Sequence, residues 1–275
     1  MTSDPSNIPL PALDGWALIL GASSGFGAAT SLALARAGVD IIGVHLDRRA
    51  TLPNVERLTA EIRALGREAW FFNVNAADDD KRAEVLAEVS RRFAERGRGE
   101  QVRVLLHSIA FGTLRDLVIS PPDEVVTRKQ MDMTIDVMAN SLVYWAQGLV
   151  HGELLSNQGR IFAMTSNGSS QVWRRYGVVS AAKAALEAHI RQLAFELGPR
   201  GITANSICAG VTDTPAIRKI PDNEAIIEVA IRKNPWHRLT RPEDVANAIV
   251  ALAQPCTYWL NGDVLYVDGG EAHSG

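Results

Sequence analysis

The chain has 275 residues, of which 47% are hydrophobic and 21% are charged, and its formal net charge is −3. This composition is typical of one large globular domain, and the weak negative charge argues against nucleic acid as a partner. We find neither an apolar run that could span a bilayer nor a signal peptide, so we expect a cytoplasmic protein without membrane association. The two cysteines, Cys208 and Cys256, are too few for a disulfide framework, and neither has a neighbour that suggests a metal site.

Residues 1–14 are expected to form a flexible arm, and residues 15–275 a single domain. From residue 16 onward, short apolar runs alternate with helical patterns. The expected strands span 16–21, 39–46, 68–74, 102–108, 160–166, 202–208 and 263–268, and the expected helices span 26–37, 53–65, 79–97, 127–150, 177–198 and 242–253. This alternation predicts an α/β domain with a parallel, doubly wound sheet, and strands that are apolar on both faces imply helices on both sides.

A glycine-rich segment, GASSGFG at 21–27, follows the first expected strand and opens the first expected helix. Its spacing is G-x3-G-x-G, which differs from the usual dinucleotide pattern G-x-G-x-x-G. Gly21 permits a tight turn, Gly25 lets the backbone approach a phosphate, and Gly27 lets the helix pack close to the strand. The position of the segment therefore predicts a nucleotide cofactor, with these candidate contacts: Gly21, Ser23, Ser24, Gly25, Phe26 and Gly27.

A second segment, RRYGVVSAAKAALEAH at 174–189, holds a tyrosine and a lysine seven residues apart. Seven residues nearly complete two helical turns, so Tyr176 and Lys183 can share one face of a helix. Lys183 lies among alanines and apolar residues, where a buried ammonium group needs a partner. We therefore take the two residues as a candidate catalytic pair.

The segment 213–235 departs from the alternation of strands and helices. It carries three prolines and a short helical pattern over 223–232, and it follows the sixth expected strand. An insertion beside the edge of the sheet where ligands bind is a candidate substrate lid.

Together, four ordered motifs resemble the short-chain dehydrogenase/reductase superfamily. They are the glycine-rich segment, the segment 174–189, NSICAG at 205–210 and GDVLYVDGG at 262–270, and the resemblance covers roughly residues 14–270. It implies a Rossmann-type fold, a nicotinamide cofactor and usually a homotetramer.

Within this superfamily the chain most resembles the NADPH-dependent, type III-like enoyl-[acyl-carrier-protein] reductases. The likeness lies in the Y-x6-K spacing, in HSIAFG at 107–112 and in the segment 212–245, whereas ketoreductases space the tyrosine and lysine by four. Moving the tyrosine three residues earlier shifts its anchor roughly 4.5 Å along the helix axis. This shift suits conjugate reduction, because the oxygen that gains charge in an enoyl thioester lies two carbons beyond the carbon that accepts hydride.

The resemblance thus implies reduction of the carbon–carbon double bond of a trans-2-enoyl thioester in fatty acid biosynthesis, with acyl carrier protein or coenzyme A as the carrier. Tyr176 is the implied hydrogen-bond donor, Lys183 binds the nicotinamide ribose, and Ser166 stands where ketoreductases carry a catalytic serine. The resemblance also implies cofactor contacts after the third, fourth and sixth expected strands: Asn73, Val74, Ser108, Ile109, Ala110, Gly210, Thr212 and Thr214.

The choice between NADPH and NADH depends on VHLDRR at 44–49. His45 stands where NAD-dependent members carry the aspartate that binds the ribose 2′-hydroxyl, and Arg48 or Arg49 is placed to bind a 2′-phosphate. We therefore expect NADPH, with the alternative that Asp47 turns inward and favours NADH.

Two other functions stay open. The chain departs from the ketoreductases at Met138, where they carry an asparagine that holds a relay water, and Asn140 is rotated from that position by about 200° around the helix. A reductase of a ketone, steroid or sugar is one alternative. A cofactor-binding regulatory or structural protein without turnover is the other.

Overall fold

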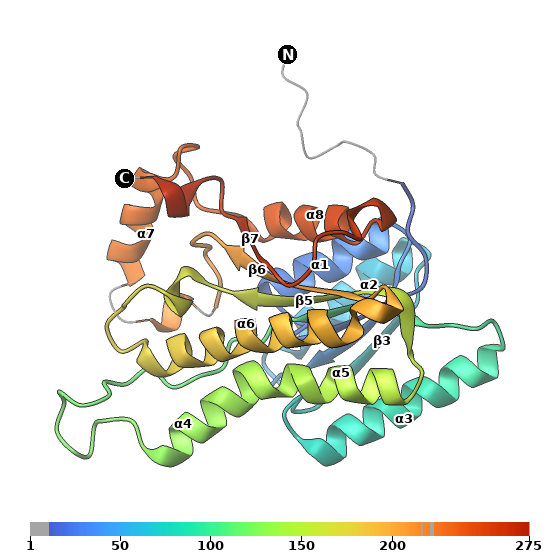
Figure 1. Cartoon of the computed structure of the whole chain (residues 1–275), viewed down its shortest axis with the longest axis horizontal. Helices are drawn as coiled ribbons and strands as arrows, with labels where there is room; N and C mark the ends of the chain where they lie inside the picture. Colours follow the sequence, from blue (N-terminus) through green and yellow to red (C-terminus); the bar gives the residue numbers. More distant parts are fainter. Residues whose placement is uncertain (1–10, 216, 221–222, 275) are drawn as a thin grey trace.

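The computed structural model describes residues 11–215, 217–220 and 223–274. Its centre is a seven-stranded parallel sheet in the order β3-β2-β1-β4-β5-β6-β7 (Figure 1). The strands are β1 (Trp16–Leu20), β2 (Asp40–His45), β3 (Ala69–Asn73), β4 (Val102–His107), β5 (Leu155–Thr165), β6 (Thr203–Ala209) and β7 (Val264–Val267). The order reverses between β1 and β4, as in Rossmann-type folds, so the predicted fold class is confirmed.

Helices cover both faces of the sheet (Figure 1). They are α1 (Gly25–Arg36), α2 (Leu52–Ala64), α3 (Asp79–Arg96), α4 (Arg128–Ile135), α5 (Ser141–His151), α6 (Gly177–Leu197), α7 (Asn223–Lys233) and α8 (Pro242–Leu252). Residues of α1, α2 and α8 share one buried core with the sheet, and residues of α3, α5 and α6 share another. The sheet is therefore the middle layer of three.

Strand β1 shows why both faces are covered. All five residues of WALIL are buried; Trp16, Leu18 and Leu20 belong to the α3/α5/α6 core, and Ala17 and Ile19 to the other. Successive side chains of a strand point to opposite faces, so an unbroken apolar strand needs a helix layer on each side.

Two elements differ from their predicted bounds. β5 begins at Leu155, five residues before the expected strand 160–166, because Leu155 already pairs with Val102 of β4. The expected helix 127–150 contains a π-helical turn over Asp136–Asn140, which separates α4 from α5. The hydroxyl of Ser141 donates to the carbonyl oxygen of Val137 at 2.9 Å within this turn.

The structure describes parts of the two segments predicted to lie outside the sheet, the arm at 1–14 and the lid at 213–235. Residues 1–10 of the expected arm lie outside the described residues, whereas Leu13 is buried and its N–H donates to the carbonyl of Ala37 at 2.7 Å. In the expected lid, 213–235, the structure shows a short 3-10 helix (Ile217–Lys219) and α7. Among the helices of the described ranges, none has the length and apolar character that crossing a bilayer requires.

Candidate active site

The turn between β1 and α1 has the shape of a phosphate cradle. Gly21 has a φ of +85°, and a Cβ there would lie 2.4 Å from the carbonyl oxygen of Ser108. A Cβ on Gly27 would lie 2.1 Å from the carbonyl oxygen of Gly21, so only glycine lets α1 pack this closely. Ser24 precedes α1 without a side-chain capping bond, which leaves the first N–H groups available to an anion. The turn therefore fits the diphosphate of a dinucleotide. It brings together the predicted loop residues Gly21, Ser23, Ser24, Gly25, Phe26 and Gly27.

The loop after β6 lies against this turn. A Cβ on Gly25 would be 3.6 Å from Cγ2 of Thr214, so this buried threonine borders the cradle. Thr212 is also buried, and its hydroxyl donates to the carbonyl of Gly210 at 2.9 Å. The predicted cofactor contacts after β1 and β6 thus share the carboxyl edge of the sheet, where ligands bind in such folds.

Asp47 forms a hydrogen-bonded cluster just after β2. Its Oδ2 lies 2.9 Å from Nδ1 of His45. The side-chain amide of Asn73 bonds the backbone of Asp47 twice, accepting from its N–H at 2.9 Å and donating to its carbonyl at 3.0 Å. Burial acts to raise the pKa of Asp47, but hydrogen bonds from Thr51, Ser23 and His45 outweigh it and lower the pKa. The carboxylate is therefore ionised and turned inward.

The other predicted contacts around this cluster lie as follows. Arg48 and Arg49 are both exposed. Asn73 uses its amide on Asp47, and the N–H of Val74 donates to the carbonyl of His45 at 2.8 Å. After β4, the N–H of Ser108 donates to the carbonyl of Leu20 at 2.8 Å. This bond places Ser108, and Ile109 and Ala110 after it, beside the phosphate cradle.

Tyr176 is placed by a tight turn just before α6. Arg175 has a φ of +60°, and the N–H of Tyr176 donates to the carbonyl of Trp173 at 3.2 Å. The tyrosine ring lies over Gly168, where a Cβ would be 2.4 Å from Cε1 of the ring. Its Oη lies 3.2 Å from Oγ of Ser166, the residue that follows β5. Two of the predicted catalytic residues therefore meet at the carboxyl end of β5.

Lys183 is buried on the inner face of α6. Its Nζ donates to the carbonyl oxygen of Met164 at 2.7 Å. Burial lowers the pKa of Lys183 to about 8, and the charge of Glu187, one turn further along α6, opposes this change. Glu187 accepts a hydrogen bond from the hydroxyl of Thr165 at 2.5 Å. Lys183 thus reaches the same strand end as Tyr176.

The phenol of Tyr176 is a hydrogen-bond donor at neutral pH. Burial raises its pKa, and the hydrogen bond with Ser166 offsets only part of this effect. A protonated phenol held by Ser166 can donate a hydrogen bond to a substrate oxygen on which negative charge develops.

A family model described as enoyl-(acyl carrier protein) reductase matches residues 21–271. The chain belongs to this family of short-chain dehydrogenases/reductases. The 3-oxoacyl-[acyl-carrier-protein] reductase FabG of Pseudomonas aeruginosa is 28% identical over 257 residues, which cover 92% of this chain and 96% of the relative. The enoyl-[acyl-carrier-protein] reductase [NADH] 2 of Rhizobium meliloti is 32% identical over 166 residues, 60% of each chain.

A solved short-chain dehydrogenase from Burkholderia cenocepacia in complex with NADP has a TM-score of 0.78 to this chain at 27% identity. The match covers 93% of this chain and 97% of the Burkholderia chain. The chain is therefore an NAD(P)H-dependent short-chain reductase.

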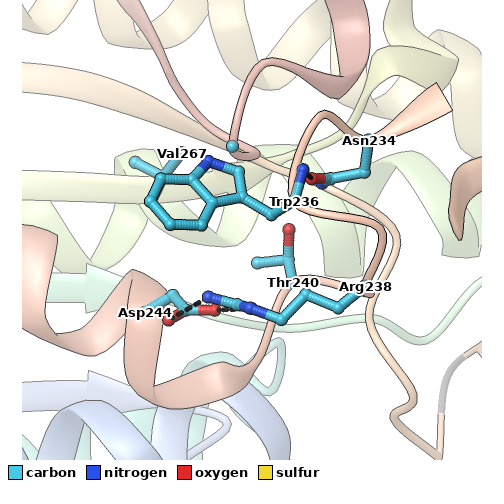
Figure 2. A pocket seen from close by; sticks show the side chains of 7 residues that line it. Asn234, Trp236, Arg238, Thr240, Asp244 and Val267 are labelled. Atoms are coloured by element: carbon cyan, nitrogen blue, oxygen red, sulfur yellow. Dashed lines mark hydrogen bonds and ion pairs between the residues drawn. The ribbon is translucent and has the colours of Figure 1, made fainter. Parts of the chain in front are cut away.

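This short-chain reductase also contains a small cavity outside the predicted site. The cavity has a volume of about 220 Å³ (Figure 2). It is lined by Asn234, Trp236, Arg238, Thr240, Asp244, Val267 and Gly269. Two nitrogens of Arg238 donate to the carboxylate of Asp244 at 2.6 and 3.1 Å, so the two charged groups of the lining neutralise each other. Neither Tyr176 nor Lys183 lines it.

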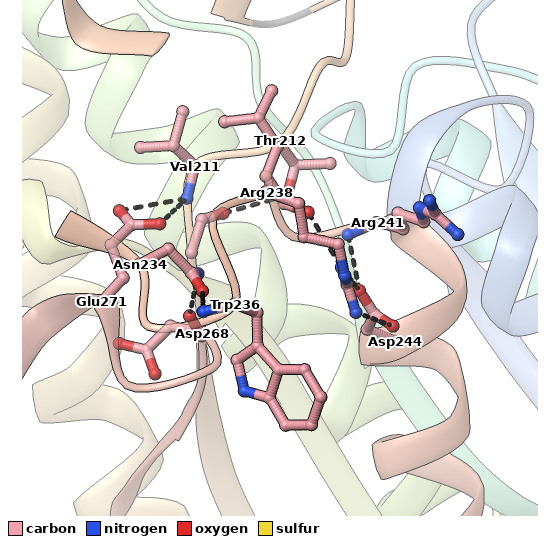
Figure 3. A network of polar contacts seen from close by, with 11 residues as sticks. Val211, Thr212, Asn234, Trp236, Arg238, Arg241, Asp244, Asp268 and Glu271 are labelled. Carbon is pink, nitrogen blue, oxygen red and sulfur yellow. Dashed lines mark hydrogen bonds and ion pairs between the residues drawn. The ribbon is translucent and has the colours of Figure 1, made fainter. Parts of the chain in front are cut away.

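Next to this cavity, a polar network supports the loop that carries Thr212 (Figure 3). The N–H of Val211 donates to the carboxylate of Glu271 at 3.1 Å, and the carbonyl of Val211 accepts from the N–H of Thr240 at 3.1 Å. Both sides of Val211 are thus held by residues from the C-terminal part of the chain. This network fixes the backbone of Val211, the residue before Thr212.

Three features of the reductase site were not predicted. They are Gly168 beneath the tyrosine ring, the Thr165–Glu187 pair and a buried histidine, His107, at the end of β4. Only Glu187 carries a sequence signal, because it follows Lys183 by four residues and so shares its helix face. The others depend on contacts between distant segments.

Proposed function

We propose that this reductase reduces the carbon–carbon double bond of a trans-2-enoyl thioester, with NADPH as the hydride donor, in fatty acid biosynthesis. The observation that carries the proposal is the position of Tyr176. It directly precedes α6, seven residues before Lys183, and its Oη lies 3.2 Å from Oγ of Ser166. A donor displaced along the helix in this way suits an oxygen two carbons away from the carbon that accepts hydride.

In this mechanism the bound nicotinamide cofactor supplies the hydride that the β-carbon of the substrate accepts. Tyr176 donates a hydrogen bond from Oη to the thioester oxygen, which gains negative charge as the enolate forms. Ser166 holds Oη in place, and the Lys183 ammonium group binds the ribose hydroxyls and stabilises the charge. A proton from solvent then adds to the α-carbon and completes the saturated thioester.

Exposed apolar side chains near the start of α6 support an acyl chain as substrate. Leu117 packs on the first residue of α6, since a Cβ on Gly177 would be 3.0 Å from its Cδ1. Val118, Ile119 and Val172 are 81%, 86% and 99% exposed. Apolar surface of this extent indicates an apolar ligand or partner. We assign the segment 213–235, with α7, as the lid over this chain, and acyl carrier protein as the carrier.

Asp47 does turn inward, as expected of an NADH-dependent member, but its carboxylate is already engaged by His45, Ser23 and Thr51, so we choose NADPH as the cofactor. The carboxylate of Asp47 is bonded by His45, whereas Arg48 and Arg49 are exposed. The loop therefore offers guanidinium groups, which pair well with a phosphate.

The test compares crotonyl and acetoacetyl thioesters as substrates of the purified protein, with NADPH oxidation followed by absorbance. We expect turnover of the crotonyl thioester, and a loss of about 100-fold or more in kcat/KM for Tyr176→Phe. Tyr144→Phe is the matched control, because that ring lies 5.3 Å from the guanidinium of Arg82 on α3 and outside the site.

Two outcomes would contradict the proposal. Reduction of the acetoacetyl thioester alone would indicate a ketoreductase, the activity that the Pseudomonas relative is named for. Binding of NADPH without turnover of enoyl, keto or aldehyde substrates would indicate a regulatory protein.

A further inference from the structure

His107, the last residue of β4, carries a buried imidazole with one unused nitrogen. Its side chain is fully buried, and its Nε2 lies 2.9 Å from Oγ of Ser141 on α5. Its Nδ1 is buried and has no hydrogen-bond partner among the described residues. A buried polar atom without a partner is uncommon and indicates a ligand, a water or a mobile donor nearby.

The network around Ser141 determines which nitrogen carries the proton. The Ser141 hydroxyl lies 2.9 Å from the carbonyl oxygen of Val137, which can only accept, so the hydroxyl proton points there. Oγ of Ser141 must then accept from Nε2–H of His107. Burial, and after it the charge of Lys183, lowers the pKa of His107 to about 3 against smaller opposing effects of the backbone carbonyls of Val137 and of His107 itself, so the ring is neutral. Nδ1 is therefore a lone-pair acceptor.

Lys183 lies in the same layer as this acceptor. His107 follows Leu105 by two residues in β4, so both side chains point to the face covered by α6. His107 is the register partner of Ala163 in β5, and Lys183 donates to the carbonyl of Met164, the next residue along that strand. Only one of the three N–H donors of the ammonium group is used there.

We propose that His107 is a positioning residue for Lys183, and that its Nδ1 accepts a hydrogen bond from one buried water that the Lys183 ammonium group binds. The contact would hold the lysine charged and aimed at the carboxyl edge of the sheet. In the ketoreductase pattern, an asparagine that holds a relay water stands at the position of Met138, whose side chain has no strong hydrogen-bonding group. In this chain His107 supplies the polar group from β4. The inference rests on the role proposed for Lys183 at the cofactor.

Glu187 favours the ammonium form of Lys183 from the same helix. In the proposed contact, His107 favours it as well, as an acceptor from β4. Tyr176 at the start of α6 and Cys208 in β6 are neutral at pH 7, because burial raises the pKa of each. Loss of the His107 acceptor therefore removes stabilisation of the charged lysine and lowers its pKa.

The sign of the pH effect follows from this arrangement. The wild-type pKa of Lys183 is lowered to about 8. If the ammonium form is the active one, kcat/KM falls as the pH rises through this value. Without the acceptor, the fall begins at lower pH.

Two variants of His107 separate positioning from a structural role. In His107→Gln the amide nitrogen reaches Ser141 as Nε2 does, but no acceptor stands where Nδ1 was. We expect the midpoint of the alkaline fall in kcat/KM to move down by about one pH unit. His107→Asn keeps an oxygen close to the position of Nδ1 and is expected to hold the wild-type midpoint. An equal loss of kcat/KM at every pH, or an unshifted midpoint in His107→Gln that unfolds at the wild-type temperature, would overturn the inference.

A measurement without turnover keeps this inference separate from the proposed function. The chain has six histidines, so selective ¹⁵N labelling gives few imidazole signals, and those of His107 are the ones lost in His107→Gln. We expect a protonated Nε2 and a hydrogen-bonded Nδ1 whose resonance moves toward that of an unbonded nitrogen in Lys183→Met. A protonated Nδ1, or no movement in Lys183→Met, would exclude the contact even if the enzyme reduces enoyl thioesters.

Discussion

Arg48 and Arg49 follow directly after Asp47, whose inward carboxylate is bonded by His45 at 2.9 Å. A guanidinium group on the 2′-phosphate contributes a charge-assisted hydrogen bond that NADH cannot form. We therefore expect Arg48→Ala, Arg49→Ala or both to raise the KM for NADPH about 10-fold and to leave the KM for NADH unchanged. Steady-state kinetics with both cofactors measures this difference.

Arg57→Ala on α2 is a suitable control for these variants, because that side chain is exposed and forms only a long contact of 3.9 Å with Glu61. An equal rise of both KM values would indicate a change in the loop itself. A wild-type enzyme that prefers NADH would contradict the assignment and make Asp47 the residue that selects the cofactor.

Single residues also show how far the site could be predicted. Helix pitch predicted that Tyr176 and Lys183 share one face of a helix; Lys183 lies in α6, whereas Tyr176 is the residue before it and is placed by a tight turn. The orientation of Asp47 was not predictable, because it depends on Asn73, which lies 26 residues away and bonds its backbone. His107 was not predictable either, since its partner Ser141 is 34 residues away and on another element.

Among the elements, the turn between β1 and α1 tolerates the least change. A Cβ on Gly27 would lie 2.1 Å from the carbonyl oxygen of Gly21, and both atoms are held by the packing of α1 on β1. We expect Gly27→Ala to lower the free energy of unfolding by about 1–3 kcal/mol and to weaken NADPH binding at least 10-fold. Chemical denaturation and fluorescence titration with NADPH measure the two effects.

Gly66→Ala provides the comparison, because nothing lies within 4 Å of a Cβ at that position, although its φ of +75° still disfavours alanine. It is expected to cost stability without weakening NADPH binding. If Gly27→Ala bound NADPH as the wild type does, the cradle would not depend on the close approach of α1.

The elements themselves were predicted well where the pattern was apolar and less well where it was polar. The first strand was expected at 16–21 and is found at Trp16–Leu20. The polar residues 156–159 at the start of β5 gave no strand signal, and only the pairing of Leu155 with β4 reveals them as part of the strand. The π-turn Asp136–Asn140 was also missed, because the sequence of 127–150 was read as one continuous helical pattern, and no residue in it marks a wider turn.

For the whole molecule, exposed aromatic side chains near the end of α6 indicate an interface. Phe195, Tyr258 and Trp259 are 79%, 60% and 85% exposed. Their loop is fixed to α6, since Asn261 donates to the carbonyl of Ala194 at 3.1 Å. Patches of this kind on a folded domain commonly mark contacts between chains. We therefore expect a homotetramer, as the resemblance to short-chain reductases also implies.

Size-exclusion chromatography with light scattering tests this expectation. The wild type should have about four times the mass of the 29.8 kDa chain, and the double variant Phe195→Ser, Trp259→Ser should have a lower mass. Val172→Ser, at an apolar position near the substrate site, should leave the mass unchanged. A monomeric wild type would contradict the homotetramer.

The glycine beneath the tyrosine ring has a consequence for how such enzymes diverge. The ring of Tyr176 fills the space that a side chain at position 168 would need. The ring can therefore keep its position only while the residue beneath it has no side chain. Any larger residue there would displace the phenol from its place beside Ser166. The position of this phenol is thus vulnerable to a change in a residue that has no functional side chain of its own.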